Sequence, residues 1–173
     1  MNTQMNLRGN IQTALLLAIG LMMHGTVPGI MGGMKFDFML AFIFIAIFLN
    51  PSFKNTMMTA LVGGFLSAMT TTFPGGQIPN IIDKFVTCLF VYLVIKVMTQ
   101  VGKMNMLGYG LISIGGTIIS GSVFLGTAMG MMGLPLPISL LIMTVVLPTA
   151  AGNLIVTTTI YAALARVKKL TRA

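Results

Sequence analysis

The sequence predicts an all-α integral membrane protein that forms a single membrane domain over residues 1–173 with six transmembrane helices. Hydrophobic residues make up 56% of the chain and charged residues only 7%, whereas soluble domains carry about 25% charged residues. Apolar windows of roughly 17 to 25 residues recur along the whole chain, and each matches a hydrocarbon core of about 30 Å at about 1.5 Å per residue. These windows leave no room for a separate soluble domain.

The limits of each span follow from the apolar runs and from the polar or turn-forming residues between them. The first run follows Arg8, and we expect it to be a retained helix because no convincing small-residue cleavage site follows it. Lys54 separates the second span from the third, and Lys103 separates the fourth from the fifth. We expect the six spans at residues 10–27, 36–52, 55–73, 81–101, 106–129 and 148–167.

The last apolar region, residues 137–167, requires a break. As one straight helix it would be about 46 Å long, which exceeds one crossing. Pro148 lacks a backbone N–H and disfavours helix at the preceding residue. We therefore expect a short segment at 137–146 near the outer surface, followed by a span from about Pro148.

The distribution of positive charge predicts that both termini are cytoplasmic. With that orientation the outer side holds only Lys35 and Lys84, and each has an aspartate nearby, Asp37 or Asp83. Positive charge is normally concentrated in the cytoplasmic loops of membrane proteins. The inner side then holds eight of the ten cations, namely Arg8, Lys54, Lys96, Lys103, Arg166, Lys168, Lys169 and Arg172.

Composition excludes several classes of function. The net charge of +8 would suggest nucleic-acid binding in a soluble protein, but here the cations flank apolar segments and set orientation. Cys88 is the only cysteine, which excludes an intramolecular disulfide and a multi-cysteine metal site. The 17 methionines suit packing in lipid and between helices. Because neither a nucleophile–base set nor a metal cluster is present, we expect neither an enzyme nor a cofactor.

Two polar stretches fall on the predicted outer side. "GGMKFDF" (32–38) lies between the first two spans and "GGQIPNIIDK" (75–84) between the third and fourth. Each combines a Gly-Gly turn, one cation and one anion, and phenylalanines lie nearby. A carboxylate ligand needs a cation, an ammonium needs an anion, and an aromatic ring needs apolar walls. The grouping therefore favours a small amphipathic, zwitterionic solute, although ordinary loop charges at glycine and proline turns are the alternative.

Other polar residues are weaker candidates for the same binding site. Asn153 lies about 20 Å up the last helix from Arg166, in the outer half of the bilayer, where it either faces the cavity or bonds a neighbouring helix. Gln77 and Asn80 lie in the second polar stretch. His24, near the outer end of the first span, is more typical of an interfacial or interhelical residue than of a ligand.

Small residues occur on one face of the first span. Ala14 and Ala18 are four residues apart, so another helix can approach the backbone there. Packing within the bundle is the alternative to a docking surface. The stretch 112–126 is also rich in small residues, which is typical of a tightly packed helix.

Three stretches give the chain a family resemblance: "GGMKFDFML", "FPGGQIPNIIDK" and "LPTAAGN". With the alanine pair, they resemble the substrate-binding S subunits of energy-coupling-factor (ECF) transporters, and most closely the tryptophan-specific branch. The resemblance implies a six-helix protein of the bacterial cytoplasmic membrane that captures L-tryptophan at its outer side. It also implies a separate membrane (T) subunit and two ATPase subunits as partners, with Ala14 and Ala18 against the T subunit.

The same resemblance assigns roles to the outer polar residues. Lys35 or Lys84 would bind the tryptophan carboxylate, and Asp37 or Asp83 its ammonium. Phe36 and Phe73 would form the walls around the indole. Hydrogen bonds to the ligand would come from Gln77, Asn80 or Asn153.

Two other classes of function remain open from the sequence. A solitary secondary transporter would use Asp37 or Asp83 as its proton site, because carboxylates in membrane pockets commonly serve that role. A membrane scaffold would bind no small ligand.

Overall fold

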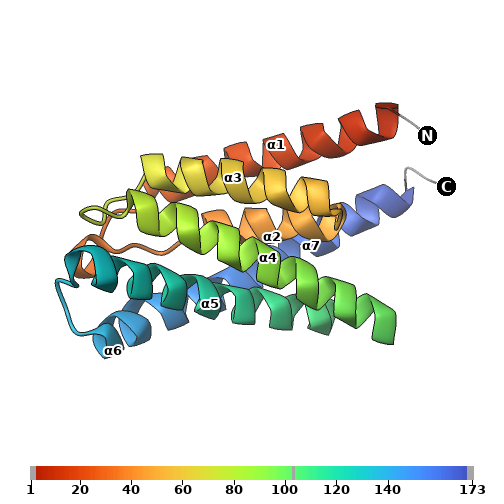
Figure 1. The fold of residues 1–173 in the computed structure, drawn as a ribbon. Helices are drawn as coiled ribbons and strands as arrows, with labels where there is room; N and C mark the ends of the chain where they lie inside the picture. The colour runs from red at the N-terminus through yellow and green to blue at the C-terminus, as the bar shows by residue number, and fades with distance from the viewer. Residues whose placement is uncertain (1–2, 103, 171–173) are drawn as a thin grey trace.

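The computed structural model describes residues 3–102 and 104–170 of the chain. In this part every regular element is helical, which confirms the predicted all-α class (Figure 1). Six helices have eleven or more residues, and a one-turn helix precedes the last of them. In chain order the helices are α1 (Thr3–Thr26), α2 (Met39–Leu49), α3 (Phe53–Met69), α4 (Gln77–Val101), α5 (Met106–Met132), α6 (Ile138–Leu141) and α7 (Leu147–Leu170).

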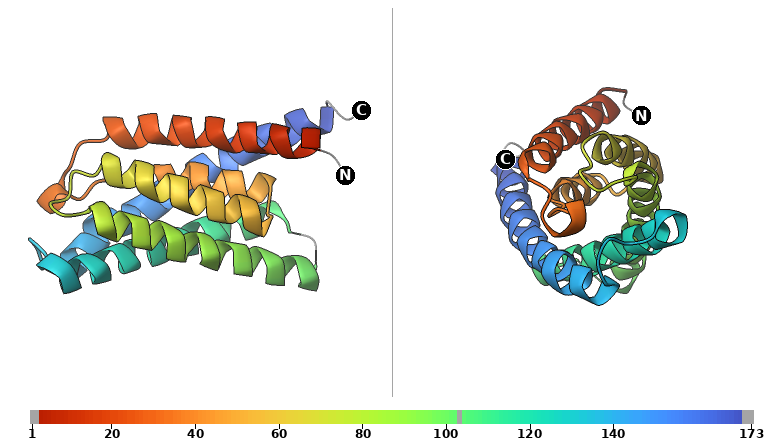
Figure 2. Two further views of the ribbon diagram at one scale, coloured as in Figure 1. Left: turned by 45° about the horizontal axis from the view of Figure 1, so that its top comes forward. Right: turned by 90° about the vertical axis from the view of Figure 1, so that its left-hand side faces the viewer.

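Helix α2 forms the centre of the bundle. Every residue from Met39 to Phe48 is buried, and the end-on view in Figure 2 shows the other long helices arranged around it. A helix that is apolar on all sides is expected to be buried on all sides. At 11 residues it is about 16 Å long, so it is shorter than the span predicted at 36–52. Residues 34–38 enter it as non-helical chain.

Helix α4 begins earlier than predicted and takes in most of the second polar stretch. Gly75 has a φ of 70° and Gly76 is the N-cap, so the Gly-Gly turn ends where the helix begins. Pro79 is tolerated because backbone N–H groups in the first helical turn have no intrahelical partner. Asp83 and Lys84 therefore lie on a helix, within the span predicted at 81–101, and their side chains are buried inside the protein.

The short outer segment before the last span is present, but it is continuous with that span. Residues Ile142–Val146 form a π-helical turn between α6 and α7, in which the Leu147 N–H donates to the Ile142 carbonyl. In a regular α-helix the Pro148 ring would collide with the carbonyl of Thr144, four residues back. The wider turn accommodates the proline where the sequence predicted a break.

The outer surface of the bundle is suited to lipid. Large apolar side chains are exposed on all five helices around α2, as shown by Leu15, Phe65, Leu93, Leu111 and Ile155, which are 56–65% exposed. Among the described residues, two helical segments, 106–132 and 138–167, are each long and apolar enough, by length and composition, to cross a membrane. The fold therefore agrees with the predicted membrane protein.

The start of α1 and the end of α7 lie at one end of the bundle, and the loops 27–38, 70–76 and 133–137 lie at the other (Figures 1 and 2). The starts of α1 and α3 and the ends of α4 and α7 share the first of these ends (Figure 1). By their positions in these helices, Arg8, Lys54, Lys96 and Arg166 each lie within about two turns of such a helix end. Of the other predicted inner cations, Lys103 and Arg172 lie outside the described residues, as do the side chains of Lys168 and Lys169. The grouping is consistent with the predicted orientation, in which the three loops face outward.

Candidate functional site

The loops 27–38 and 70–76 pack tightly against each other at the outer end. Gly33 has a φ of 85°, and a Cβ atom there would lie 2.7 Å from the Thr72 carbonyl oxygen. The Thr72 hydroxyl donates to the Gly33 carbonyl at 2.8 Å. Glycine is therefore required at position 33 both for backbone conformation and for close contact.

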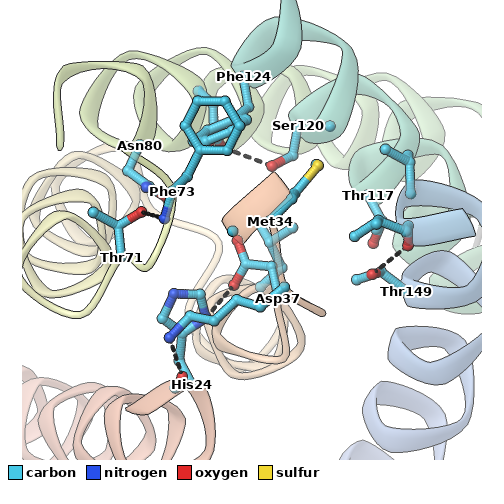
Figure 3. A pocket seen from close by; sticks show the side chains of 17 residues that line it. His24, Met34, Asp37, Thr71, Phe73, Asn80, Thr117, Ser120, Phe124 and Thr149 are labelled. Carbon is cyan, nitrogen blue, oxygen red and sulfur yellow. Dashed lines mark hydrogen bonds and ion pairs between the residues drawn. The ribbon is translucent and has the colours of Figure 1, made fainter. Parts of the chain in front are cut away.

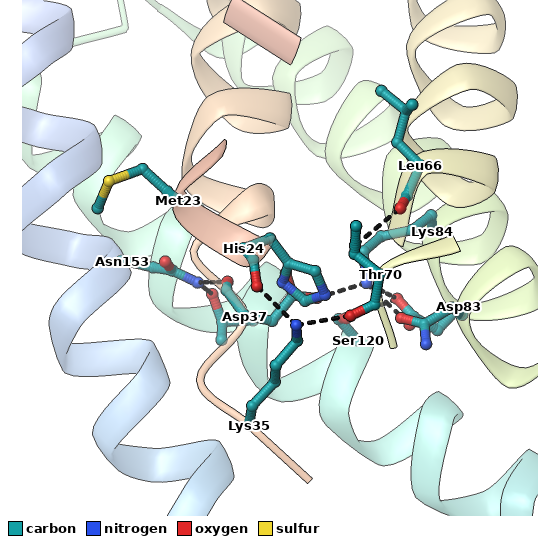
Figure 4. Close-up of polar contacts among 12 residues, drawn as sticks. Met23, His24, Lys35, Asp37, Leu66, Thr70, Asp83, Lys84, Ser120 and Asn153 are labelled. Atoms are coloured by element: carbon teal, nitrogen blue, oxygen red, sulfur yellow. Dashed lines mark hydrogen bonds and ion pairs between the residues drawn. The ribbon is translucent and has the colours of Figure 1, made fainter. Parts of the chain in front are cut away.

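Lys35 joins two helix ends beneath these loops. It is 7% exposed, and its ammonium donates to the carbonyls of His24 and Thr70, both at 2.6 Å (Figure 4). These carbonyls belong to the last turn of α1 and the C-cap of α3, where backbone acceptors lack helical partners. Burial lowers the pKa of Lys35, and the nearby Asp37 carboxylate partly offsets this effect. One of its three N–H donors is left over from these two bonds.

A buried ion cluster lies next to Lys35. The Lys84 ammonium, which is fully buried, donates to Asp37 Oδ2 at 2.5 Å and to the two carboxylate oxygens of Asp83 at 3.1 and 2.9 Å. The Ser120 hydroxyl donates to Asp83 Oδ1 at 2.6 Å. Buried charges persist only when paired and hydrogen-bonded in this way.

A cavity of about 50 Å³ lies between the ion cluster and the C-terminal half of α5. Its lining combines polar and charged side chains with apolar ones, and in Figure 3 His24 and Asp37 lie across it from Phe73 and Phe124. The polar and charged lining residues are His24, Lys35, Asp37, Thr71, Asn80, Asp83, Thr117, Ser120 and Thr149. The other lining residues are Gly33, Met34, Leu40, Phe73, Gly121, Phe124, Val145 and Val146.

His24 is an unexpected member of the polar lining. It is 3% exposed, and its Nδ1 atom lies 3.1 Å from Asp37 Oδ1 without the alignment of a hydrogen bond. Neither ring nitrogen of His24 has a hydrogen-bond partner among the described residues, and neither does Asp37 Oδ1. The cavity wall therefore contains unused polar atoms on two adjacent side chains.

Comparison with known proteins identifies the family. A family model described as "Tryptophan transporter TrpP" matches residues 6–171. The chain belongs to the tryptophan transporter TrpP family. It is 45% identical over 162 residues to a probable tryptophan transport protein of Clostridium acetobutylicum, with 92% of this chain and 93% of the relative covered. No solved structure matches the chain.

Two further relatives have the same description. A probable tryptophan transport protein of Clostridium perfringens is 40% identical over 169 residues, which cover 91% of this chain and 93% of the relative. One of Bacillus subtilis is 40% identical over 148 residues, which cover 86% and 85%. Because the TrpP family consists of transporters, the prediction that this chain is not an enzyme is confirmed.

Five of the nine residues proposed from the sequence line the cavity of this TrpP family member. They are Lys35, Asp37, Phe73, Asn80 and Asp83. Asn80 is held by its own helix, since its amide donates to the Gly76 carbonyl at 2.7 Å.

The other four lie beside the cavity or away from it. Lys84 is behind Asp37 and Asp83, and Gln77 is exposed at the start of α4. Phe36 is partly buried against the apolar cluster next to the cavity. The Asn153 amide donates to the Asp37 backbone carbonyl at 3.0 Å and to the Thr117 hydroxyl at 3.2 Å, so it ties the loop 27–38 to α5 and α7.

Sequence reasoning missed the wall contributed by α5 and the π-helical turn. Thr117, Ser120, Gly121 and Phe124 occur at intervals of three and four residues, so they share one helical face toward the cavity. That spacing was the available signal, but the segment was interpreted as small-residue packing. His24 was interpreted as an interfacial residue, and its place in the wall depends on Asp37, which is 13 residues further along the chain.

Proposed function

We propose that this chain captures L-tryptophan at the outer side of the bacterial cytoplasmic membrane as the substrate-binding subunit of an ECF transporter. In this proposal a separate T subunit and two ATPase subunits provide the energy for uptake. The carrying observation is the cavity, whose lining brings Lys35, with one N–H beyond its two bonds, and Asp37, whose Oδ1 accepts no hydrogen bond from the described residues, together with the rings of Phe73 and Phe124. A zwitterion with an aromatic side chain complements that arrangement.

The hydrogen bonds of the ion cluster support a choice within each predicted pair. Lys84 already donates to three carboxylate oxygens, and both oxygens of Asp83 accept a bond. Lys35 keeps one N–H beyond its two bonds, and Asp37 Oδ1 accepts no hydrogen bond in the part of the chain that the structure describes. In the proposal Lys35 binds the substrate carboxylate and Asp37 binds its ammonium, while Lys84 and Asp83 hold Asp37 in place.

The apolar wall is the proposed indole site. The rings of Phe73 and Phe124 meet edge to face with centroids 5.3 Å apart, and Val145 and Val146 belong to the same apolar cluster and also line the cavity. The cavity of about 50 Å³ is smaller than the roughly 150 Å³ that accommodates benzene in a protein core. Binding of indole therefore requires the wall to move, and the loop that carries Phe73 provides one route.

Packing beneath the cavity favours capture from one side over passage through the bundle. The fully buried Phe44 lies one helical turn after Leu40, which lines the cavity, and its ring stacks on Phe48 with centroids 6.4 Å apart. Phe48 contacts Tyr109 and Tyr161 with centroids at 4.7 and 5.7 Å. A chain that moves as a whole in the membrane, as the ECF proposal requires, needs no path through this cluster.

Helix α1 supplies the proposed docking surface. Ala14 and Ala18 are both exposed on it, so they are free to contact a helix of the T subunit. Small side chains let two helix backbones approach closely in lipid.

Reconstitution in vesicles tests the energy source. Tryptophan uptake should require the T subunit, both ATPases and ATP, and the chain alone should bind tryptophan without accumulating it. A second candidate is a solitary proton-coupled transporter, favoured by the carboxyl group of Asp83, which is 1% exposed and faces the cavity. Uptake driven by a proton gradient in vesicles containing this chain alone would reject the ECF proposal and support that candidate.

A further inference from the structure

Two polar atoms on the cavity wall are adjacent and have no hydrogen-bond partner among the described residues. They are Nδ1 of His24 and Oδ1 of Asp37, which lie 3.1 Å apart. The His24 side chain is 4% exposed and that of Asp37 18% exposed, so bulk water is largely excluded from both. Burying polar atoms without partners is unfavourable, which indicates that another group completes this part of the wall.

The neighbouring carboxylate oxygens, in contrast, all accept hydrogen bonds. Asp37 Oδ2 accepts from Lys84, and both oxygens of Asp83 accept from Lys84 or Ser120. Apart from Nε2 of the same histidine, the other buried polar side-chain atoms without partners in the described part of the chain belong to residues that do not line the cavity. These residues are Thr59, Ser67, Thr87 and Asn153.

We propose that His24 is a second ligand for the ammonium group of the substrate, a role that rests on the proposed capture of tryptophan. The neutral ring, with its proton on Nε2, accepts one N–H at Nδ1 while Asp37 Oδ1 accepts another. Hydrogen bonds from nitrogen are about 2.7–3.2 Å long, so one ammonium can reach two acceptors that are 3.1 Å apart. The third N–H remains for water or another acceptor.

The position of Lys35 is consistent with this assignment. Its ammonium is bonded to the backbone carbonyl of His24 itself, so the proposed carboxylate and ammonium ligands are neighbours (Figure 4). The ammonium and carboxylate of an α-amino acid are attached to one carbon atom, so their ligands must also be adjacent. Lys35, Lys84, Asp37 and Asp83 have a formal net charge of zero when all are ionised, which matches a zwitterion.

The test compares L-tryptophan with indole-3-propionate, which keeps the ring and carboxylate but lacks the ammonium, by calorimetry on the purified protein. His24→Phe should weaken tryptophan binding about 10- to 100-fold, as expected for loss of a hydrogen bond to a charged group. Its affinity for indole-3-propionate should stay close to that of the wild-type protein. His24→Asn places an amide oxygen near the position of Nδ1 and should restore most of the tryptophan affinity, whereas His24→Gln, whose oxygen lies near Nε2, should not.

Each contrary result has a defined meaning. Equal weakening of both ligands by His24→Phe, unchanged tryptophan binding, or better rescue by Gln than by Asn would overturn the role of His24. If His24→Phe does not fold in thermal unfolding assays, the comparison of Asn with Gln gives the decision. Absence of tryptophan binding by the wild-type protein would instead reject the proposed function.

Discussion

Replacing Lys84 with methionine removes the one cation among the described residues that is bonded to both buried aspartates. The Lys84 ammonium lies 2.5 Å from Asp37 Oδ2 and 2.9 Å from Asp83 Oδ2, and it is fully buried. Loss of one partner of a buried ion pair typically destabilises a protein by about 3–5 kcal/mol. At roughly 2–4 °C per kcal/mol for a chain of this size, Lys84→Met should lower Tm by about 6–20 °C.

The single cysteine provides the assay. Cys88 is 0% exposed and lies one turn from Lys84 on α4, so a thiol-reactive dye reports its exposure during thermal unfolding in detergent. Lys54→Met, at an exposed position on α3, is the matched control and should melt like the wild-type protein. The double variant Lys84→Met with Asp37→Asn should recover part of the loss because one uncompensated carboxylate is gone. A Lys84→Met protein that melts like the control would refute the dependence of the cluster on this lysine.

Three further predictions concern the support of the site, the docking surface and the indole wall. Asn153→Ala should weaken tryptophan binding several-fold and lower Tm slightly, because an intramembrane hydrogen bond contributes about 0.6–2 kcal/mol; unchanged binding would show that its bond to the Asp37 carbonyl does not position the loop. Ala14→Leu or Ala18→Leu should preserve binding but abolish uptake by the full complex, and normal uptake would exclude this face from docking. Phe124→Ala should cost about 3–5 kcal/mol of stability and raise the affinity for 5-methyltryptophan relative to tryptophan; an unchanged ratio, measured by calorimetry, would place the indole elsewhere.

A control for the docking prediction is available on another outer helix. Ala163 on α7 is exposed, as Ala14 and Ala18 are. Ala163→Leu adds the same bulk to a different face and should leave uptake intact.

The sequence was sufficient for features that depend on local composition. The lengths of the apolar runs predicted the helices around α2. The Gly-Gly pairs predicted the turns in the loops that pack above the cavity. Lys35, Asp37 and Phe73 were found because scarce charges and aromatic rings cluster within a few positions of these turns. Such signals need no knowledge of tertiary contacts.

Features that depend on pairing between distant segments were missed or misplaced. The sequence put Asp83 and Lys84 at the membrane interface, because charges in the interior are unfavourable in isolation. Asp37 lies 46 positions before Asp83 and 47 before Lys84, too far along the chain for a local pattern to connect them. Its contact with Lys84 offsets the cost of burying these charges. The α5 wall was missed for a related reason, since Ser120 becomes distinctive only through its bond to Asp83.

The most direct test of the account is binding of L-tryptophan to the purified protein, followed through the fluorescence of the ligand. The chain contains no tryptophan, so the indole signal belongs to the ligand alone. The wild-type protein should bind L-tryptophan, and Lys35→Gln and Asp37→Asn should each weaken binding at least about 10-fold, the loss expected for one charged hydrogen bond. Lys54→Gln should bind normally. Equal affinities for all four proteins, or no binding by the wild-type protein, would contradict the claim that this outer cavity holds the substrate by its two charges.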